Sequence, residues 1–315
     1  MAKYRDHLPQ LQESTFLTDG GLETTLIFHE GIALPFFAAF PLLLTPEGKQ
    51  ILQKYYRRYL TIAQHYHTGF VLETPTWRAS LDWGQKMGYS TGQLENINRL
   101  AVTELELLRQ ELEQSDLSIV ISGCLGPRGD GYAISTKMTA LEAQEYHLPQ
   151  IKTFSQTNAD VVSAFTLNYT EEATGIINAA KACNMPVVIS YTVETDGNLP
   201  SGEPLKYAIQ EVDKLTDQYP VYYMINCAHP DHFKNKFTAP EAWVSRIKGI
   251  RANASAKSHA ELDEAEQLDI GDKQELANGY QLLKYLLPQL TVIGGCCGTD
   301  HTHLEKICQT WFQAS

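Results

Sequence analysis

The chain has 315 residues, 43% of them hydrophobic, and a formal net charge of −12. An acidic surface repels phosphate backbones, which argues against nucleic acid as a partner, and no apolar run is long enough to cross a bilayer. The polar N-terminus, MAKYRDHLPQLQEST, lacks the apolar stretch of a secretory signal, so we expect a cytoplasmic protein whose six cysteines are thiols, metal ligands or core residues rather than disulfides.

Eight short apolar segments recur along the chain. They are rich in Val, Ile, Phe and Tyr, and most are continuous rather than alternating, as expected of parallel strands buried on both faces. The predicted strands lie at 16–23, 69–76, 117–126, 159–167, 185–193, 220–228, 244–255 and 290–298.

Helical patterns separate these strands, with apolar residues at three- and four-residue steps. The expected helices lie at 46–66, 93–114, 139–158, 169–184, 205–218, 240–248, 273–288 and 300–313. Pro149 should kink the third of them or split it in two.

Strands that alternate with helices over the whole length predict an α/β fold, a single-domain (β/α)8 TIM barrel over 1–315. The polar segment around 256–272 would be an insertion. The alternative is an open doubly wound sheet, but its first turn would normally carry G-x-G-x-x-G, and the first turn here is DGGLET.

Three cysteines lie at predicted strand ends. Cys227 ends the sixth strand, and the adjacent pair Cys296 and Cys297 ends the eighth. Because barrel active sites form where strands end, all three should face one mouth. Three thiolates that leave a fourth position open suit zinc, whereas the alternative is that all three are ordinary buried cysteines. His229 is a possible fourth ligand, although its place two residues past Cys227 makes joint ligation awkward.

The other cysteines and paired histidines have simpler interpretations. Cys124 ends the third strand, across the barrel from the eighth, and Cys183 and Cys308 are expected to be small buried residues of helices. His301 and His303 are spaced so that they point apart, which favours solvated helix residues.

Four motifs together resemble the homocysteine S-methyltransferase family: TDGGLET in strand one, INC in strand six, GGCCGT in strand eight, and SYTVETDGNLPSGEPL. The resemblance runs from about residue 15 to the C-terminus. It implies that Cys227, Cys296 and Cys297 bind Zn²⁺, that the thiol of homocysteine fills the fourth position as a thiolate, and that methyl transfer gives methionine.

The resemblance also implies substrate contacts. Asp19 would hold the amino group of homocysteine, Gly20 and Gly21 would offer backbone N–H groups to its carboxylate, and Thr74 would add a polar contact. A turn or capping role is the alternative for Asp19, and a local hydrogen bond the alternative for Thr74.

One position departs from the family pattern. Phe165 lies where relatives carry a glutamate, at the end of strand four, that contacts the substrate ammonium. Glu194, just beyond strand five, is the first choice to supply the missing charge, and Glu73 on strand two the second. Either carboxylate could instead be a solvated or barrel-lining group.

The methyl donor implied by similarity to the short enzymes of the family is a sulfonium, S-methylmethionine or S-adenosylmethionine. Trp77, Tyr132 and Tyr169 follow strand ends and either face that cation or pack in the mouth. Two other functions remain open: a methyltransferase for a different small thiol, and a non-catalytic barrel that binds zinc or thiols.

Overall fold

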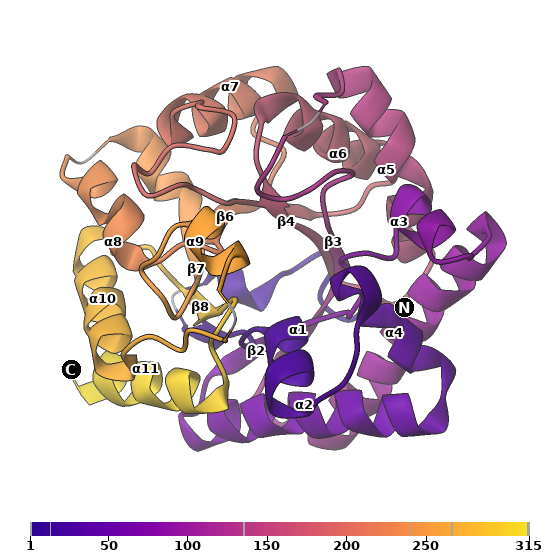
Figure 1. The fold of residues 1–315 in the computed structure, drawn as a ribbon, viewed down its shortest axis with the longest axis horizontal. Helices are drawn as coiled ribbons and strands as arrows, with labels where there is room; N and C mark the ends of the chain where they lie inside the picture. The colour runs from indigo at the N-terminus through magenta and orange to yellow at the C-terminus, as the bar shows by residue number, and fades with distance from the viewer. Residues whose placement is uncertain (1, 13, 135, 240, 266, 314–315) are drawn as a thin grey trace.

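The computed structural model describes residues 2–12, 14–134, 136–239, 241–265 and 267–313. Eight parallel strands close into a barrel in chain order, and helices surround them (Figure 1). This confirms the predicted (β/α)8 barrel. The strands are β1 (Phe16–Leu17), β2 (Gly69–Glu73), β3 (Ile119–Leu125), β4 (Val161–Leu167), β5 (Val187–Tyr191), β6 (Tyr222–Asn226), β7 (Ile247–Ala252) and β8 (Val292–Gly295).

The helices follow the predicted order, with short additional ones in the loops. They are α1 (Leu22–Thr24), α2 (Pro46–His65), α3 (Leu81–Lys86), α4 (Thr91–Leu112), α5 (Ala140–Ser155), α6 (Thr170–Ala182), α7 (Leu205–Thr216), α8 (Pro230–Phe233), α9 (His259–Asp263), α10 (Lys273–Leu286) and α11 (His301–Gln313). Local capping fixes several starts: Ser90 and Thr139 each form a capping box at the N-terminus of α4 and α5.

Two helix predictions can be compared with the structure. Of the two outcomes expected at Pro149, a split does not occur, because Pro149 lies inside the continuous helix α5. The helix expected at 240–248 is only a 3₁₀ turn, Ala242–Arg246, and β7 begins directly after it. Residue 240 lies outside the described residues. So do residue 266 of the predicted insertion and residues 1, 314 and 315 at the ends of the predicted domain.

The core has two layers, as expected of a filled barrel. The larger layer lies between strands and helices, whereas the smaller fills the barrel and includes Val71, Val161, Val188 and Val292. The N-terminal segment joins the inner layer through Leu8. The backbone N–H of Tyr4 donates to Asp160 at 2.7 Å, which ties this segment to the start of β4.

A bulge shapes the end of β4. The register with β5 shifts between Ala164 and Leu167, and Thr166 has a left-handed φ of 62°. The side chain of Asn226, at the end of β6, accepts from the Thr166 N–H and donates to the Thr166 hydroxyl, each at 2.9 Å. A bulge of this kind re-aims a neighbouring side chain, here Phe165, toward the barrel mouth.

The polar insertion around 256–272 folds over the mouth of the barrel rather than away from it. Figure 1 shows α9 near the ends of β6 and β7. Ser258 caps α9, and the ring of His259, its first residue, contacts the Cys227 carbonyl at the end of β6. Among the described residues, no helix combines the length and apolar character needed to span a membrane.

Candidate metal centre and substrate cavity

The ends of β6 and β8 bring three sulfur atoms together. The Sγ atoms of Cys227, Cys296 and Cys297 all lie within 4.8 Å of one another. The glycines around this loop are required by close packing: a Cβ on Gly21 would lie 2.6 Å from the Cys296 carbonyl oxygen. Cys227 itself has a left-handed φ of 53°, an uncommon conformation that turns its side chain at the strand end.

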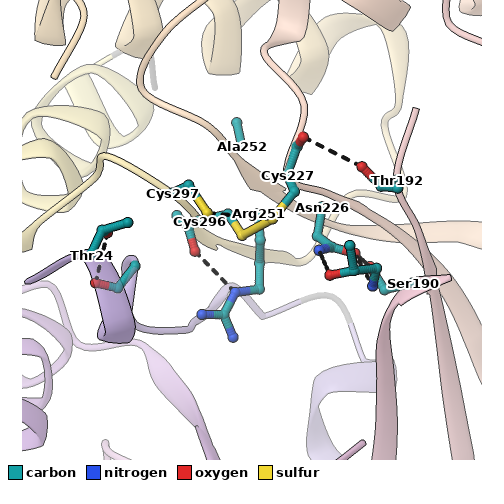
Figure 2. The surroundings of a disulfide bond; sticks show 12 residues. Thr24, Ser190, Thr192, Asn226, Cys227, Arg251, Ala252, Cys296 and Cys297 are labelled. Carbon is teal, nitrogen blue, oxygen red and sulfur yellow. Dashed lines mark hydrogen bonds between the residues drawn. A yellow bond between two sulfur atoms is a disulfide. The ribbon is translucent and has the colours of Figure 1, made fainter. Parts of the chain in front are cut away.

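Two of these cysteines are joined in this structure. Cys227 and Cys296 form a disulfide, and the Cys297 Sγ lies free at 3.9 Å from the Cys227 Sγ (Figure 2). The expectation that the cysteines are not disulfide-bonded is therefore wrong for this pair. The reason is geometric: the two Cα atoms are 5.4 Å apart, so the convergence that suits a shared metal also permits oxidation.

His229 and the remaining cysteines lie outside this cluster. His229 caps α8, and its Nδ1 accepts a hydrogen bond from the Asp231 N–H at 3.3 Å. Cys124 is buried on β3 and lines the cavity below the mouth, whereas Cys308 is buried in α11. The structure differs from expectation at His303, which is buried and bonded to Asp300 and to the Ile270 carbonyl.

The loops around the sulfurs are held by contacts that the sequence does not predict. The Nε2 of His259 lies 2.6 Å from the Cys227 carbonyl oxygen. The His259 ring also packs against Tyr132, with centroids 4.3 Å apart. The insertion thus contacts the end of β6, which carries Cys227.

A cavity of about 300 Å³ opens beside the cluster at the carboxyl ends of the strands. It lies where barrel enzymes bind their substrates, and its size is that of a small-molecule site. All the predicted substrate contacts except Glu194 line it, together with the three cysteines: Asp19, Gly20, Gly21 and Thr74.

Asp19 is already engaged by the protein. Its Oδ1 accepts from Arg251 Nη2, and its Oδ2 accepts from the Tyr55 hydroxyl at 3.1 Å. Burial opposes the charge of Arg251, but the neighbouring carboxylates of Asp19 and Glu73 hold the pKa of the guanidinium above its ordinary value. Arg251 therefore stays charged in the cavity wall. Its charge already matches that of Asp19, the carboxylate that was expected to bind an incoming ammonium.

Thr74 and Gly21 are also bonded within the protein. The Thr74 hydroxyl accepts from the Cys124 N–H at 2.8 Å and lies 2.7 Å from the Thr76 hydroxyl, so it ties β2 to β3. The Gly21 N–H donates to the Thr299 carbonyl at 3.1 Å. This N–H is therefore occupied in the structure rather than directed at a ligand.

The two candidate replacements for the missing glutamate are placed differently. Glu194 lies outside the cavity lined by the described residues, and its carboxylate pairs with His259 at 3.1 Å. Glu73 lines the cavity, and burial raises its pKa to about 7, although Arg251 acts in the opposite direction. Phe165 also lines the cavity, with its ring centroid 5.1 Å from the guanidinium carbon of Arg251.

The aromatic side chains differ in their access to a bound cation. Arg78 lies 3.8 Å from the ring centroid of Trp77, so a protein cation already covers that face. Tyr169 lies outside the cavity lined by the described residues and accepts from the Met138 N–H. Tyr132 also lines the cavity, where its ring packs against His259, and no protein cation lies over it among the described residues.

Sequence reasoning did not single out Arg251, Tyr55 or His259. A usable signal existed only for Arg251, which interrupts the apolar segment GIRANA of the seventh strand. A charged residue in a buried strand requires a partner, and Asp19 supplies it.

Solved structures of one protein share the whole fold. The homocysteine methyltransferase MmuM from Escherichia coli matches in its oxidized form with a TM-score of 0.73 and 16% identity, over 98% of this chain and 99% of that chain. Its metallated form matches with a TM-score of 0.69 and 18% identity, over 95% and 96%. Identities this low show a common fold.

The sequence comparisons point to one family. No curated protein matches the chain by sequence. A family model described as homocysteine S-methyltransferase matches residues 16–311, which cover the barrel from β1 to α11 and include all three clustered cysteines. The chain belongs to the homocysteine S-methyltransferase family.

Proposed function

We propose that this enzyme transfers a methyl group from a sulfonium donor to the thiol of homocysteine, with zinc held by Cys227, Cys296 and Cys297. The observation that carries the proposal is the convergence of three sulfurs from β6 and β8 at the wall of an amino-acid-sized cavity. Family membership supplies the reaction class.

The donor set fits zinc. Three sulfurs within 4.8 Å can surround one ion, and their place at the cavity wall leaves the fourth position facing the substrate. The disulfide must be reduced first, because both of its sulfurs are needed as thiolates. When bound, zinc lowers the pKa of a substrate thiol, so that the sulfur is a thiolate at neutral pH.

The chain's own residues position the reactants. Attack of the acceptor sulfur on the donor methyl forms a new S–CH₃ bond while the S⁺–CH₃ bond breaks, and the thiol proton leaves to solvent. Carboxylates of Asp130 and Asp263 line the cavity and favour a cationic donor, whereas the Asp269 carboxylate there is paired with Lys257 at 2.8 Å. A cavity of about 300 Å³ suits an acceptor and a donor that are both of amino-acid size. A donor that also carries a nucleoside fits less well beside the acceptor, which favours S-methylmethionine over S-adenosylmethionine.

A site that needs three thiolates works in a reducing compartment, and we expect the cytoplasm.

The test combines an assay with a structural count of sulfurs. The reduced, zinc-loaded protein should form methionine from homocysteine with S-methylmethionine as donor. X-ray absorption at the zinc edge should show three sulfur ligands without thiol and four at saturating homocysteine, even with no donor present. Three sulfurs with every small thiol tested would contradict the enzyme proposal and leave a non-catalytic zinc barrel. A fourth sulfur from another thiol alone would reassign the acceptor.

A further inference from the structure

The charge of Asp19 is already matched by a protein cation. Its two oxygens accept from Arg251 and from the Tyr55 hydroxyl, and the Asp19 side chain is only 3% exposed. A charged pair that is this well buried is expensive to break. A carboxylate without such a partner gains more from a bound ammonium, so another carboxylate of the cavity is the stronger candidate for the role that the family resemblance assigns to Asp19.

Alongside Glu23 and Asp263, which also line the cavity, Glu73 is a carboxylate with an unsatisfied oxygen. It ends β2, its side chain is 6% exposed, and it lines the cavity. Its Oε2 has no hydrogen-bond partner among the described residues. A buried oxygen without a donor costs free energy, and a bound ammonium would remove that cost.

Arg251 offers a complementary group. Its Nε donates to the Gly295 carbonyl at 3.0 Å and its Nη2 to Asp19 and Gly20, whereas Nη1 makes no hydrogen bond to a described residue. In the sheet, Arg251 on β7 pairs with Asn226 on β6 and with Gly294 on β8. Asn226 directly precedes Cys227, and Gly294 lies shortly before Cys296. Figure 2 shows the guanidinium beside the sulfur cluster, with its terminal nitrogens directed away from the sulfurs.

Resting on the function proposed above, we infer that Glu73 binds the ammonium of the acceptor amino acid and that Arg251 Nη1 binds its carboxylate. The two charges of the zwitterion are thus held by β2 and β7, while the thiol reaches the cysteines. Phe165 has a supporting role: its ring lies on Arg251 and keeps the end of β4 free of a competing carboxylate.

Glu73 and Arg251 can be tested separately with three acceptors: homocysteine, 4-mercaptobutanoate, which lacks the ammonium, and 3-aminopropane-1-thiol, which lacks the carboxylate. For the wild-type protein, both truncated thiols should have a KM about tenfold to a hundredfold above that of homocysteine. Glu73→Gln should raise the KM for homocysteine by the same factor and leave that for 4-mercaptobutanoate within about twofold. Arg251→Lys should raise the KM for homocysteine and 4-mercaptobutanoate but not for 3-aminopropane-1-thiol.

Matched controls lie on the outer surface, where Arg57 and Glu111 form an exposed ion pair. Glu111→Gln and Arg57→Lys make the same chemical changes and should alter no KM. The wild-type comparison of acceptors needs no variant, so it holds even if a cavity variant folds poorly.

The outcomes separate this inference from the proposed function. Suppose that homocysteine adds a fourth sulfur at the zinc edge, so that the proposed function holds. The ammonium site is then wrong if Glu73→Gln raises the KM for homocysteine and for 4-mercaptobutanoate equally, or raises neither KM. An ammonium-specific loss in Asp19→Asn or Glu194→Gln, and not in Glu73→Gln, would move the site to that residue. If no thiol adds a sulfur, the proposed function fails first.

Discussion

The guanidinium of Arg251 on β7 donates to the carboxylate of Asp19, which follows β1, so a buried ion pair crosses the mouth of the barrel past β8. The same guanidinium donates to the carbonyls of Gly20 and Gly295, both in loops that flank the sulfur cluster. The pair therefore links the cavity wall to the loop that carries Cys296.

The ion pair predicts a specific pattern of stability. Arg251→Met leaves Asp19 charged and unpaired in the cavity wall and should lower the free energy of unfolding by about 3–5 kcal/mol. Adding Asp19→Asn removes the stranded charge, so the double variant should recover a large part of that loss. Urea unfolding of Arg251→Met, Asp19→Asn and the double variant at pH 7 measures the difference. A double variant as unstable as the sum of the two single changes would show that the residues do not act as a pair.

The sulfur cluster predicts which cysteines control metal content. Cys227→Ala, Cys296→Ala and Cys297→Ala should each lose most of the zinc, because a site with two remaining thiolates is too weakly held. Cys308→Ala is the matched control: it deletes a buried sulfur far from the cavity and should affect only stability. Zinc content after desalting measures the effect, and a Cys296→Ala protein with one zinc per chain would contradict the cluster.

The Cys227–Cys296 disulfide predicts that oxidation and metal binding exclude each other. After chelation in air, the protein should lose two reactive thiols, bind no zinc and have no activity, and a dithiol reductant should restore all three. Thiol titration and zinc binding on the same sample provide the measurement. Zinc binding by the oxidised protein at full stoichiometry would show that the disulfide pair is not part of the metal site.

Glu73 predicts a pH dependence. Burial raises its pKa to about 7, against the effects of Arg251 and Ser122, while Asp19 acts in the same direction as burial. As pH rises through about 7, the carboxylate forms and can bind an ammonium, so the KM for homocysteine should fall. In Glu73→Gln, the KM for homocysteine should lack this pH-dependent fall. The variant therefore distinguishes the ionisation of Glu73 from that of the substrate thiol.

The same raised pKa fixes the sign of a stability effect. Between the ordinary pKa of a glutamate and about 7, the folded protein keeps a proton that the unfolded chain has released, so the stability of the wild-type protein falls as pH rises. Thermal unfolding of Glu73→Gln should show a smaller decline over this range. Parallel curves for the two proteins would mean that Glu73 is not buried as a carboxyl group.

The barrel was predictable because its signal is distributed over the chain. Each buried strand is a continuous apolar segment, and each strand end carries Gly, Asn, Thr or Cys, so an error in one segment leaves the pattern intact. The clustered cysteines were predictable for the same reason, since parallel strand ends must meet at one face.

The partners of the charged groups were not predictable, because they depend on side-chain direction at single positions. Glu194 follows the end of β5 and Glu73 is the last residue of β2, yet of these two carboxylates only Glu73 lines the cavity. The β4 bulge at Thr166 depends on a side-chain bond from Asn226, a contact between residues 60 positions apart that leaves no periodic signal. The fold of the insertion over the mouth depends similarly on the contact between His259 and Cys227.

Phe165→Glu tests whether the departure from the family pattern is reversible. The substitution restores a carboxylate at the end of β4, and simple addition of charge would predict tighter binding of the ammonium. However, the Phe165 ring lies 5.1 Å from the Arg251 guanidinium carbon, so the introduced carboxylate should pair with Arg251 and draw it from Asp19 and from the substrate carboxylate. We therefore expect the KM for homocysteine to rise by about tenfold, from loss of uniform binding, while zinc content stays unchanged. Phe165→Leu, which keeps the site apolar, is the control and should change the KM much less. A lower KM in Phe165→Glu would mean that Arg251 does not govern the head group, and that the ammonium of homocysteine binds at the end of β4 after all.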